Sequence, residues 1–99
     1  MADRPVIVAG WIRVDPSARQ RYLDDHRPVI EAARVAPGCV DFHLTPDPIE
    51  DDRINVYEHW ESAAAVERFR GSGPGDDDQQ AIRDAHVDQF DIASRTSLT

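Results

Sequence analysis

The sequence contains no lysine, so all of its basic residues are arginines. These 11 arginines are outnumbered by 19 acidic residues, which leaves a net charge of −8 at neutral pH. Proteins that bind nucleic acid or anionic membranes release counterions through a clustered basic surface. No cluster of arginines occurs along this chain. We therefore expect neither nucleic acid nor a membrane surface to be a partner.

Cysteine is also scarce, and the single Cys39 excludes a disulfide within the chain and is typical of a reducing compartment. The longest apolar run, at 6–14, has only the length of a strand, and the polar residues 1–5 do not resemble a signal peptide. A cytoplasmic location is the simplest interpretation. At 99 residues the chain predicts one domain, 1–99, whose small core a partner subunit would help to stabilise.

The hydrophobic pattern predicts four strands, at 6–14, 39–45, 53–60 and 87–95. Helices are expected from Asp15-Pro16 to about Ala36, from Ser62 to about Arg70, and from Asp76 to about Ala85. Pro28 lies inside the first helix and should kink it. The order β-α-β-β-α-β predicts an α+β protein of the ferredoxin-like split β-α-β type. Such a protein has a four-stranded antiparallel sheet with its helices on one face.

The two faces of this sheet differ in character, because strand side chains alternate between them. The even-numbered face is apolar enough to bind the helices, and consists of Val6, Val8, Ile12, Val40, Phe42, Leu44, Ile54, Val56 and Trp60. The odd-numbered face is half polar and half aromatic, which predicts a symmetric interface with a second copy. The residues expected in this homodimer interface are Trp11, His43, Asn55, Tyr57 and His59. An alternative is that the C-terminal tail covers this face. This alternative is weaker, because Thr96–Thr99 is short and polar.

Three segments resemble the antibiotic biosynthesis monooxygenase (ABM) family. They are Pro37-Gly-Cys-Val-Asp-Phe-His-Leu44, then Pro46-Asp-Pro48, and finally Arg53-Ile-Asn-Val-Tyr-Glu-His-Trp-Glu-Ser62 followed by Ala64 and Ala65. The resemblance implies a dimeric α+β barrel, formed when two sheets pack face to face, with a pocket between helices and sheet. Members of the family include cofactor-free oxygenases of quinols or aromatic polyketides, haem-degrading enzymes and proteins of unknown role.

Within this resemblance Trp60 matches the family tryptophan and is a candidate pocket wall, the alternative being a plain core aromatic. Tyr22, Phe42, Val56 and Phe69 would supply further apolar walls as substrate-binding residues. Glu58 shares the helix-side face, where a hydrogen bond to a helix end or an arginine is favoured over general-base catalysis.

His26 is the candidate catalytic base, because its spacing from Tyr22, Val29 and Ile30 places it on the inward face of the first helix. A neutral imidazole there could take the proton of a phenol and so open the way to reaction with oxygen. The alternative is a partly buried histidine bonded to a backbone carbonyl.

Other branches of the family are matched less well. The haem-degrading branch has an asparagine, a tryptophan and an axial histidine that align with Gly10, Phe69 and His86. Two of the three are replaced, although His86 alone could ligate iron or line the pocket. The quinone-forming branch has an asparagine at the position of Val56, and the neighbouring Asn55 should point away.

His43, His59, Cys39 and Asp41 share the odd face. A zinc site needs three or four converging ligands, and interface hydrogen bonds are favoured, so no metal is expected. The leading hypothesis is a cofactor-independent monooxygenase of a small phenolic or quinol-type aromatic. A non-catalytic dimeric binding protein is the alternative, and a haem-binding or haem-degrading enzyme is a weaker one.

Overall fold

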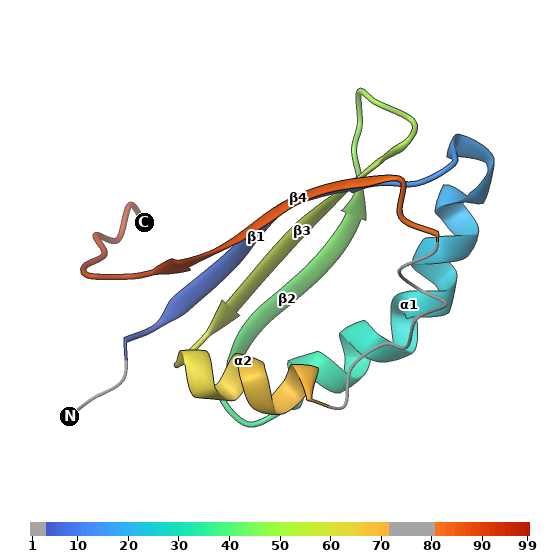
Figure 1. Ribbon diagram of the computed structural model, residues 1–99. Helices are drawn as coiled ribbons and strands as arrows, with labels where there is room; N and C mark the ends of the chain where they lie inside the picture. The colour runs from blue at the N-terminus through green and yellow to red at the C-terminus, as the bar shows by residue number, and fades with distance from the viewer. Residues whose placement is uncertain (1–3, 72–80) are drawn as a thin grey trace.

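The computed structural model describes residues 4–71 and 81–99. Its four strands form one antiparallel sheet in the order β2-β3-β1-β4. The elements are β1 (Val6–Arg13), the 3-10 turn η1 (Pro16–Ala18), α1 (Arg19–Arg34), β2 (Cys39–Pro46), β3 (Arg53–Trp60), α2 (Ala63–Arg70) and β4 (Asp84–Asp91). Both helices lie on the same side of the sheet (Figure 1). This is the α+β, ferredoxin-like arrangement that the sequence predicts.

Side chains fix the starts of both helices, as the sequence predicts. The carboxylate of Asp15 accepts a hydrogen bond from the backbone N–H of Ser17 at 2.9 Å, which begins the 3-10 turn that leads into α1. The hydroxyl of Ser62 accepts from the N–H of Ala65 at 3.1 Å at the start of α2. α1 continues through Pro28 as one helix and bends along its length in Figure 1.

The even-numbered face forms the core, as predicted. Its fully or nearly buried strand residues are Val6, Val8, Ile12, Phe42, Ile54 and Trp60. The prediction is wrong for Val40, which is 55% exposed. A bulge between Cys39 and Asp41 makes Val40 the extra residue of the strand, and Cys39 takes its place against the core. A bulge of one residue breaks the alternation on which the prediction rests.

The predicted third helix is wrong wherever the structure describes it. Its residues Asp84 and Ala85 belong to β4, which begins at Asp84 rather than at 87 and ends at Asp91 rather than at 95. Residues 76–80 lie outside the described part of the chain. Asp84 and Ala85 pair with Arg13 and Ile12 of β1. Backbone pairing with a neighbouring strand therefore overrides the local helix signal of the acidic run.

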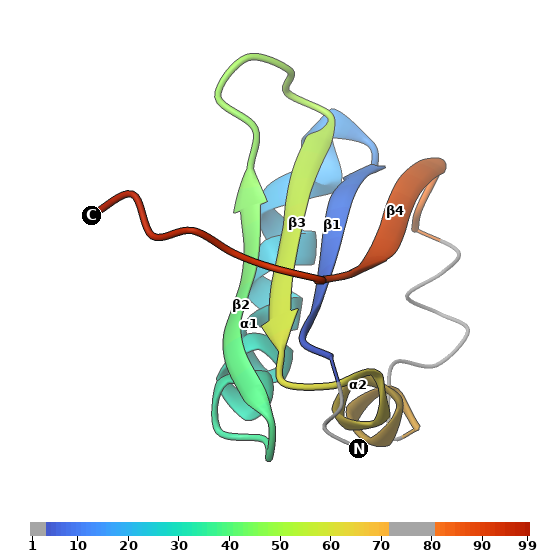
Figure 2. The ribbon, with the colours of Figure 1, turned by 90° about the vertical axis from the view of Figure 1, so that its left-hand side faces the viewer.

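The odd face is open along much of its length. Tyr57 is 37% exposed and Phe90 52%, and all eight residues of β4 are exposed although the strand is paired. After β4 the chain turns and crosses this face (Figure 2), where residues 92–95 lie against Pro5 and His59. The C-terminal tail thus covers one end of the odd face only.

Within the described residues no helix has the length and hydropathy needed to cross a membrane.

Candidate functional site

Three aromatic residues meet on the helix side of the sheet. The Phe69 ring of α2 lies 5.4 Å from the Trp60 ring and 6.0 Å from the Phe42 ring, measured between centroids. Trp60 is completely buried, so its indole packs as a core aromatic in this structure. A hollow of about 190 Å³ adjoins the cluster at Phe69, and its walls are Ala36, Pro37, Ala65, Arg68 and Phe69. Of the predicted pocket walls, the structure therefore places Phe69 at an open space.

Glu58 is a buried carboxylate beside this cluster, with only 3% of its surface exposed. Its Oε1 accepts a hydrogen bond from Trp60 Nε1 at 3.0 Å, and its Oε2 accepts one from Arg70 Nη2 at 2.8 Å. Burial raises the pKa of Glu58, while the nearby Arg70 charge and both hydrogen bonds act in the opposite direction. The bond to an arginine that the sequence predicts is present, and it ties the last turn of α2 to β3.

His26 is buried on the inward face of α1, as its spacing predicts. Its Nδ1 lies 2.7 Å from the carbonyl oxygen of Tyr22, and its ring stacks on the Tyr22 ring with centroids 4.0 Å apart. A carbonyl oxygen only accepts hydrogen bonds, so Nδ1 carries the proton. The basic atom of the neutral imidazole is then Nε2. The carbonyl bond expected of a structural histidine is present, and it fixes the proton of a neutral imidazole on Nδ1.

These predicted residues lie on one side of the sheet but in two groups. Trp60 and Phe42 belong to a cluster that Phe69 joins from α2. Tyr22 and Val56 pack against a second cluster, built from Ile12, Val14 and Ile54. Leu44 packs against both clusters. The structure therefore brings the expected wall residues to the same layer between helices and sheet, with His26 and Trp60 toward different ends of it.

His86 is not brought to this layer. It stands opposite Trp11 in the pairing of β1 with β4, and the two rings stack with centroids 5.9 Å apart on the odd face. Phe69 lies on the other face of the sheet. The positions that align with the haem-degrading branch are thus separated by the sheet. The predicted start of the last strand, at 87, left this placement of His86 undetermined.

Gly10 stands at the position that aligns with the asparagine of the haem-degrading branch. Its φ is 154°, and a Cβ built on it would lie 1.8 Å from the carbonyl oxygen of His86. Contacts this short between a Cβ and backbone do not occur, so β4 leaves no room for a side chain at this point. An asparagine could stand here only if β4 moved.

Asn55 points to the odd face, as predicted. Its side chain donates to Asp47 Oδ1 and accepts from Arg53 Nε, both at 2.8 Å. The bond from Asn55, with backbone N–H groups of the turn that follows, lowers the pKa of Asp47 to about 2. Asn55 therefore fixes the β2–β3 loop and is absent from the helix-side layer.

A cation–π cluster that was not predicted from the sequence lies at the same end of the odd face. The guanidinium groups of Arg13 and Arg53 lie 4.9 and 5.7 Å from the centre of the Trp11 ring. Arg13 also forms ion pairs with Asp52 at 2.7 Å and Glu50 at 3.1 Å. The sequence feature that could have predicted this cluster is the acidic run of the loop, which lies next to two arginines at strand ends.

The remaining odd-face candidates do not form a metal site. His43 Nε2 lies 2.8 Å from Asp41 Oδ2, and Arg34 donates to His43 Nδ1 at 3.3 Å. Cys39 turns toward the core, and burial raises the pKa of its thiol. In the part of the chain that the structure describes, no three histidine, cysteine or acidic side chains converge as metal ligands.

Comparisons with known proteins agree with this fold. An uncharacterised protein of Synechocystis sp. is 33% identical over 66 residues, which are 67% of this chain but only 45% of that protein. A candidate antibiotic biosynthesis monooxygenase of Nitrosomonas europaea has a TM-score of 0.79 at 10% identity, with 98% of each chain covered. A haem-degrading protein of Mycobacterium tuberculosis has a TM-score of 0.69 at 20% identity, covering 96% of this chain and 98% of that one.

The two solved structures share the fold of this chain. Its sequence family is shown by a separate comparison. The model of the family described as "Antibiotic biosynthesis monooxygenase" matches residues 5–87. This range contains both helices, the first three strands and all the candidate residues on the helix side of the sheet. The chain therefore belongs to the antibiotic biosynthesis monooxygenase family.

Proposed function

We propose that the protein is a monooxygenase that oxidises a small phenolic or quinol-type aromatic without a cofactor. The observation that carries the proposal is the buried His26, whose bond to the Tyr22 carbonyl places the basic lone pair on Nε2. A base of this kind can take the phenolic proton, and the resulting phenolate can transfer an electron to O₂. One oxygen atom enters the substrate to give a quinone, and the other leaves as water, with both reducing equivalents supplied by the substrate.

The chain then has three tasks in this reaction: to bind the ring, to deprotonate it and to exclude water. The apolar side chains between helices and sheet, among them Phe42 and Phe69, would bind the ring. His26 would accept the proton. His26 stacks on Tyr22, which packs against one core cluster, whereas Phe42 and Phe69 belong to the other, so the substrate would have to reach from one cluster to the other between helices and sheet.

Oxygen uptake with a panel of anthrone- and hydroquinone-like phenols tests this proposal. We expect wild-type protein to turn over at least one of them and His26→Ala to be slower by about 100-fold, the usual contribution of a general base. His43→Ala is the matched control, because His43 lies on the odd face, and it should retain wild-type turnover. Circular dichroism of each variant confirms folding. Turnover on no phenol, or equal losses in both variants, would contradict the proposal.

A second candidate is a non-catalytic protein that binds a small aromatic in the same layer. The observation in its favour is Val56, which stands where the quinone-forming branch has an asparagine, while Asn55 is held on the odd face by Asp47 and Arg53. This candidate predicts that a phenol raises the melting temperature of the protein without forming product. The same panel therefore separates the two functions.

We also propose that the protein forms a homodimer through the odd face, where Trp11, His43, Asn55, Tyr57 and His59 lie. Support comes from the exposed aromatic side chains of this face and from the four β4 residues that share it, Asp84, His86, Asp88 and Phe90, all of which are exposed. A paired strand that buries none of its side chains adds little to the core of one chain. A second sheet packed against this face would bury the four β4 side chains that point to it.

Analytical ultracentrifugation at micromolar concentration tests the dimer. Wild-type protein should sediment as a dimer, and Tyr57→Glu as a monomer, because the substitution puts a charge into the middle of the interface. Val35→Glu is the control, since Val35 is 84% exposed at the end of α1. A monomeric wild-type protein, or a dimer that Tyr57→Glu leaves intact, would overturn this arrangement.

A further inference from the structure

The hollow beside Phe69 opens between α2 and the turn that follows α1. The described residues that line it are Ala36 and Pro37 of the turn and Ala65, Arg68 and Phe69 of α2. Its volume is about 190 Å³, and a cavity of roughly 150 Å³ is enough to bind benzene. The hollow therefore has room for one aromatic ring with a small substituent.

Close packing fixes the two walls of this hollow against each other. Gly38 ends the turn with a φ of 85°, and a Cβ built on it would lie 2.6 Å from the Cβ of Ala65. The backbone N–H of Glu61 donates to the carbonyl oxygen of Gly38 at 2.7 Å, just before α2 begins. The turn and the helix are thus held at a set distance. A ligand would enter a preformed space, and its binding would need little ordering of the chain.

Arg68 is the charged residue among these walls, and it differs from the other arginines of the two helices. Arg21 and Arg27 of α1 form ion pairs with acidic residues four positions later, and Arg70 of α2 binds Glu58. The residues three and four positions before Arg68 are alanines. Within residues 4–71 and 81–99, the guanidinium of Arg68 has no hydrogen bond or ion pair. It is therefore available to bind an anion.

The other walls are apolar and suit a flat ring. Ala36 and Ala65 end in a methyl group, and Pro37 adds a rigid apolar ring. The Phe69 ring packs on two core aromatics and also lines the hollow, where a second ring could take an edge-on or offset position. A guanidinium beside such walls matches a ligand with an anionic group on an aromatic body.

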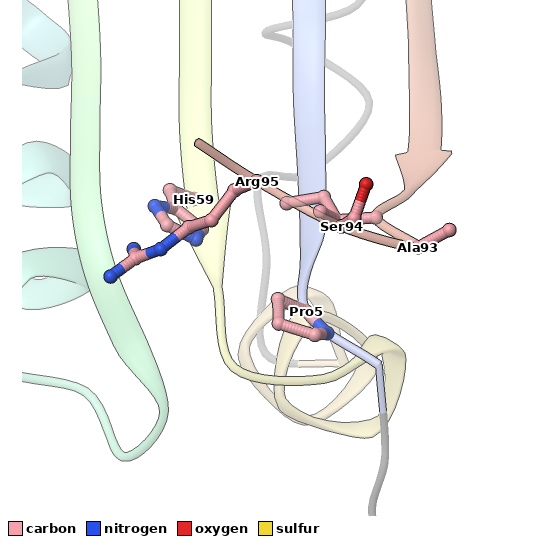
Figure 3. A pocket seen from close by; sticks show the side chains of 6 residues that line it. Pro5, His59, Ala93, Ser94 and Arg95 are labelled. Carbon is pink, nitrogen blue, oxygen red and sulfur yellow. The ribbon is translucent and has the colours of Figure 1, made fainter. Parts of the chain in front are cut away.

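The hollow beneath the C-terminal tail does not combine its groups in this way. In Figure 3 the Ser94 hydroxyl and the Arg95 guanidinium lie on opposite sides of it, so they do not converge on one ligand group. It also lies on the odd face, where we place the second copy. Of these two hollows, the one beside Phe69 is therefore the better candidate for a small ligand.

We propose that the hollow beside Phe69 binds a small aromatic carboxylate such as benzoate. Arg68 would bind the carboxylate through two parallel N–H donors, and the ring would lie against Phe69 and Pro37. The inference goes beyond the proposed oxidation and does not depend on it. His26 stacks on Tyr22, which packs against the other core cluster, and benzoate has no phenolic proton to lose.

Isothermal titration of the full chain with sodium benzoate tests the inference, with benzamide as a neutral probe of the same shape. We expect saturable binding of benzoate and at least about ten-fold weaker binding of benzamide, because the amide lacks the charge that Arg68 recognises. Arg68→Gln should weaken benzoate by about ten-fold or more and change the binding of benzamide by less than about three-fold.

A second variant, Phe69→Leu, tests the position of the ring. It should weaken benzoate and benzamide by a similar factor of about two- to ten-fold, because both probes lose the same aromatic contact. Circular dichroism confirms that the variant folds, since Phe69 also packs on the core. Unchanged binding of both probes to the folded variant would place the ligand elsewhere and overturn the inference.

The matched control is Arg21→Gln, because it removes the same charge from a side chain that is 87% exposed on α1. It should bind benzoate as wild-type protein does. Three results would each overturn the inference. These are wild-type protein that shows no saturable binding of benzoate, equal binding of benzoate and benzamide, and the same loss in Arg21→Gln as in Arg68→Gln.

Discussion

Replacing Gly10 with alanine is expected to destabilise the protein by about 3 kcal/mol or more. The new Cβ would lie 1.8 Å from the carbonyl oxygen of His86 and 2.8 Å from Val87 Cα, and both of these are backbone atoms. A flexible side chain could move aside, but backbone held in a sheet cannot do so without loss of pairing. The φ of 154° at Gly10 adds strain for any residue that has a Cβ. Urea unfolding followed by circular dichroism measures the loss.

Gly71→Ala is the matched control for this experiment. Gly71 follows α2 with a φ of −60°, which any residue adopts, and a Cβ there would lie 3.3 Å from the carbonyl oxygen of Glu67. Its replacement should change the free energy of unfolding by less than about 1 kcal/mol. If Gly10→Ala were as stable as Gly71→Ala, the close approach of β1 and β4 would not exist in solution.

The same contact bears on the chemistry of the protein. The haem-degrading branch has an asparagine at the position of Gly10, and the present spacing of β1 and β4 admits no side chain there. His86 is held on the odd face by the same pairing. The pairing of β4 with β1 therefore leaves no room for a side chain at position 10 and also sets the place of His86 on the odd face.

The alternation of apolar residues was enough to predict the faces of the sheet. Val6, Val8 and Ile12 are buried as expected, and Asn55 and Tyr57 lie on the opposite face. Alternation succeeds because each backbone step in a strand reverses the direction of the side chain. It fails at Val40, where one extra residue shifts the register. No residue type in that segment marks the bulge, so the sequence alone could not show it.

The helix-side layer was predictable in composition but less so in its contacts. The spacing of His26 on α1 indicated its inward direction, and the structure confirms this. Its contact with the Tyr22 carbonyl follows from the i−4 geometry of a helix and was one of the two stated alternatives. The partner of Glu58 was predicted only as an arginine or a helix end. Arg70 is selected by the angle at which α2 packs on β3, which depends on tertiary contacts.

The extent of β4 was the least predictable feature. The sequence 84–91 mixes acidic and apolar residues, and none of its side chains is buried in a single chain. A strand whose residues are all exposed carries little hydrophobic pattern from which its ends could be read. Its place in the sheet comes from backbone pairing with β1, and this pairing brings Phe90 to the odd face opposite Ile7.

Replacing Glu58 with alanine is expected to cost about 2–4 kcal/mol, because it removes the partner of Trp60 Nε1 and of Arg70 and leaves a cavity in the core. Glu58→Gln keeps an oxygen that can accept from Trp60 and should cost less. Glu61→Ala and Glu61→Gln are the controls, because Glu61 is exposed at the end of the same strand. Urea unfolding of wild-type protein and of the Glu58 and Glu61 variants, repeated at several pH values, measures these differences in the free energy of unfolding.

The two Glu58 variants should also differ in their dependence on pH. The pKa of Glu58 is raised above 4.5 in the folded protein, chiefly by burial. At a pH between 4.5 and this raised pKa, the folded state therefore binds more protons than the unfolded state. The resulting stabilisation is fully present below 4.5 and is lost as the pH rises through the folded pKa. Glutamine does not titrate, so the stability of wild-type protein should fall relative to Glu58→Gln as the pH rises from about 4.5 toward neutrality. Two results together would contradict this account: a stability difference between wild-type protein and Glu58→Gln that is the same at every pH in this range, and a loss in Glu58→Ala no larger than that in Glu61→Ala. They would show that the Glu58 carboxylate is hydrated and that the Glu58–Arg70 pair does not hold α2 to β3.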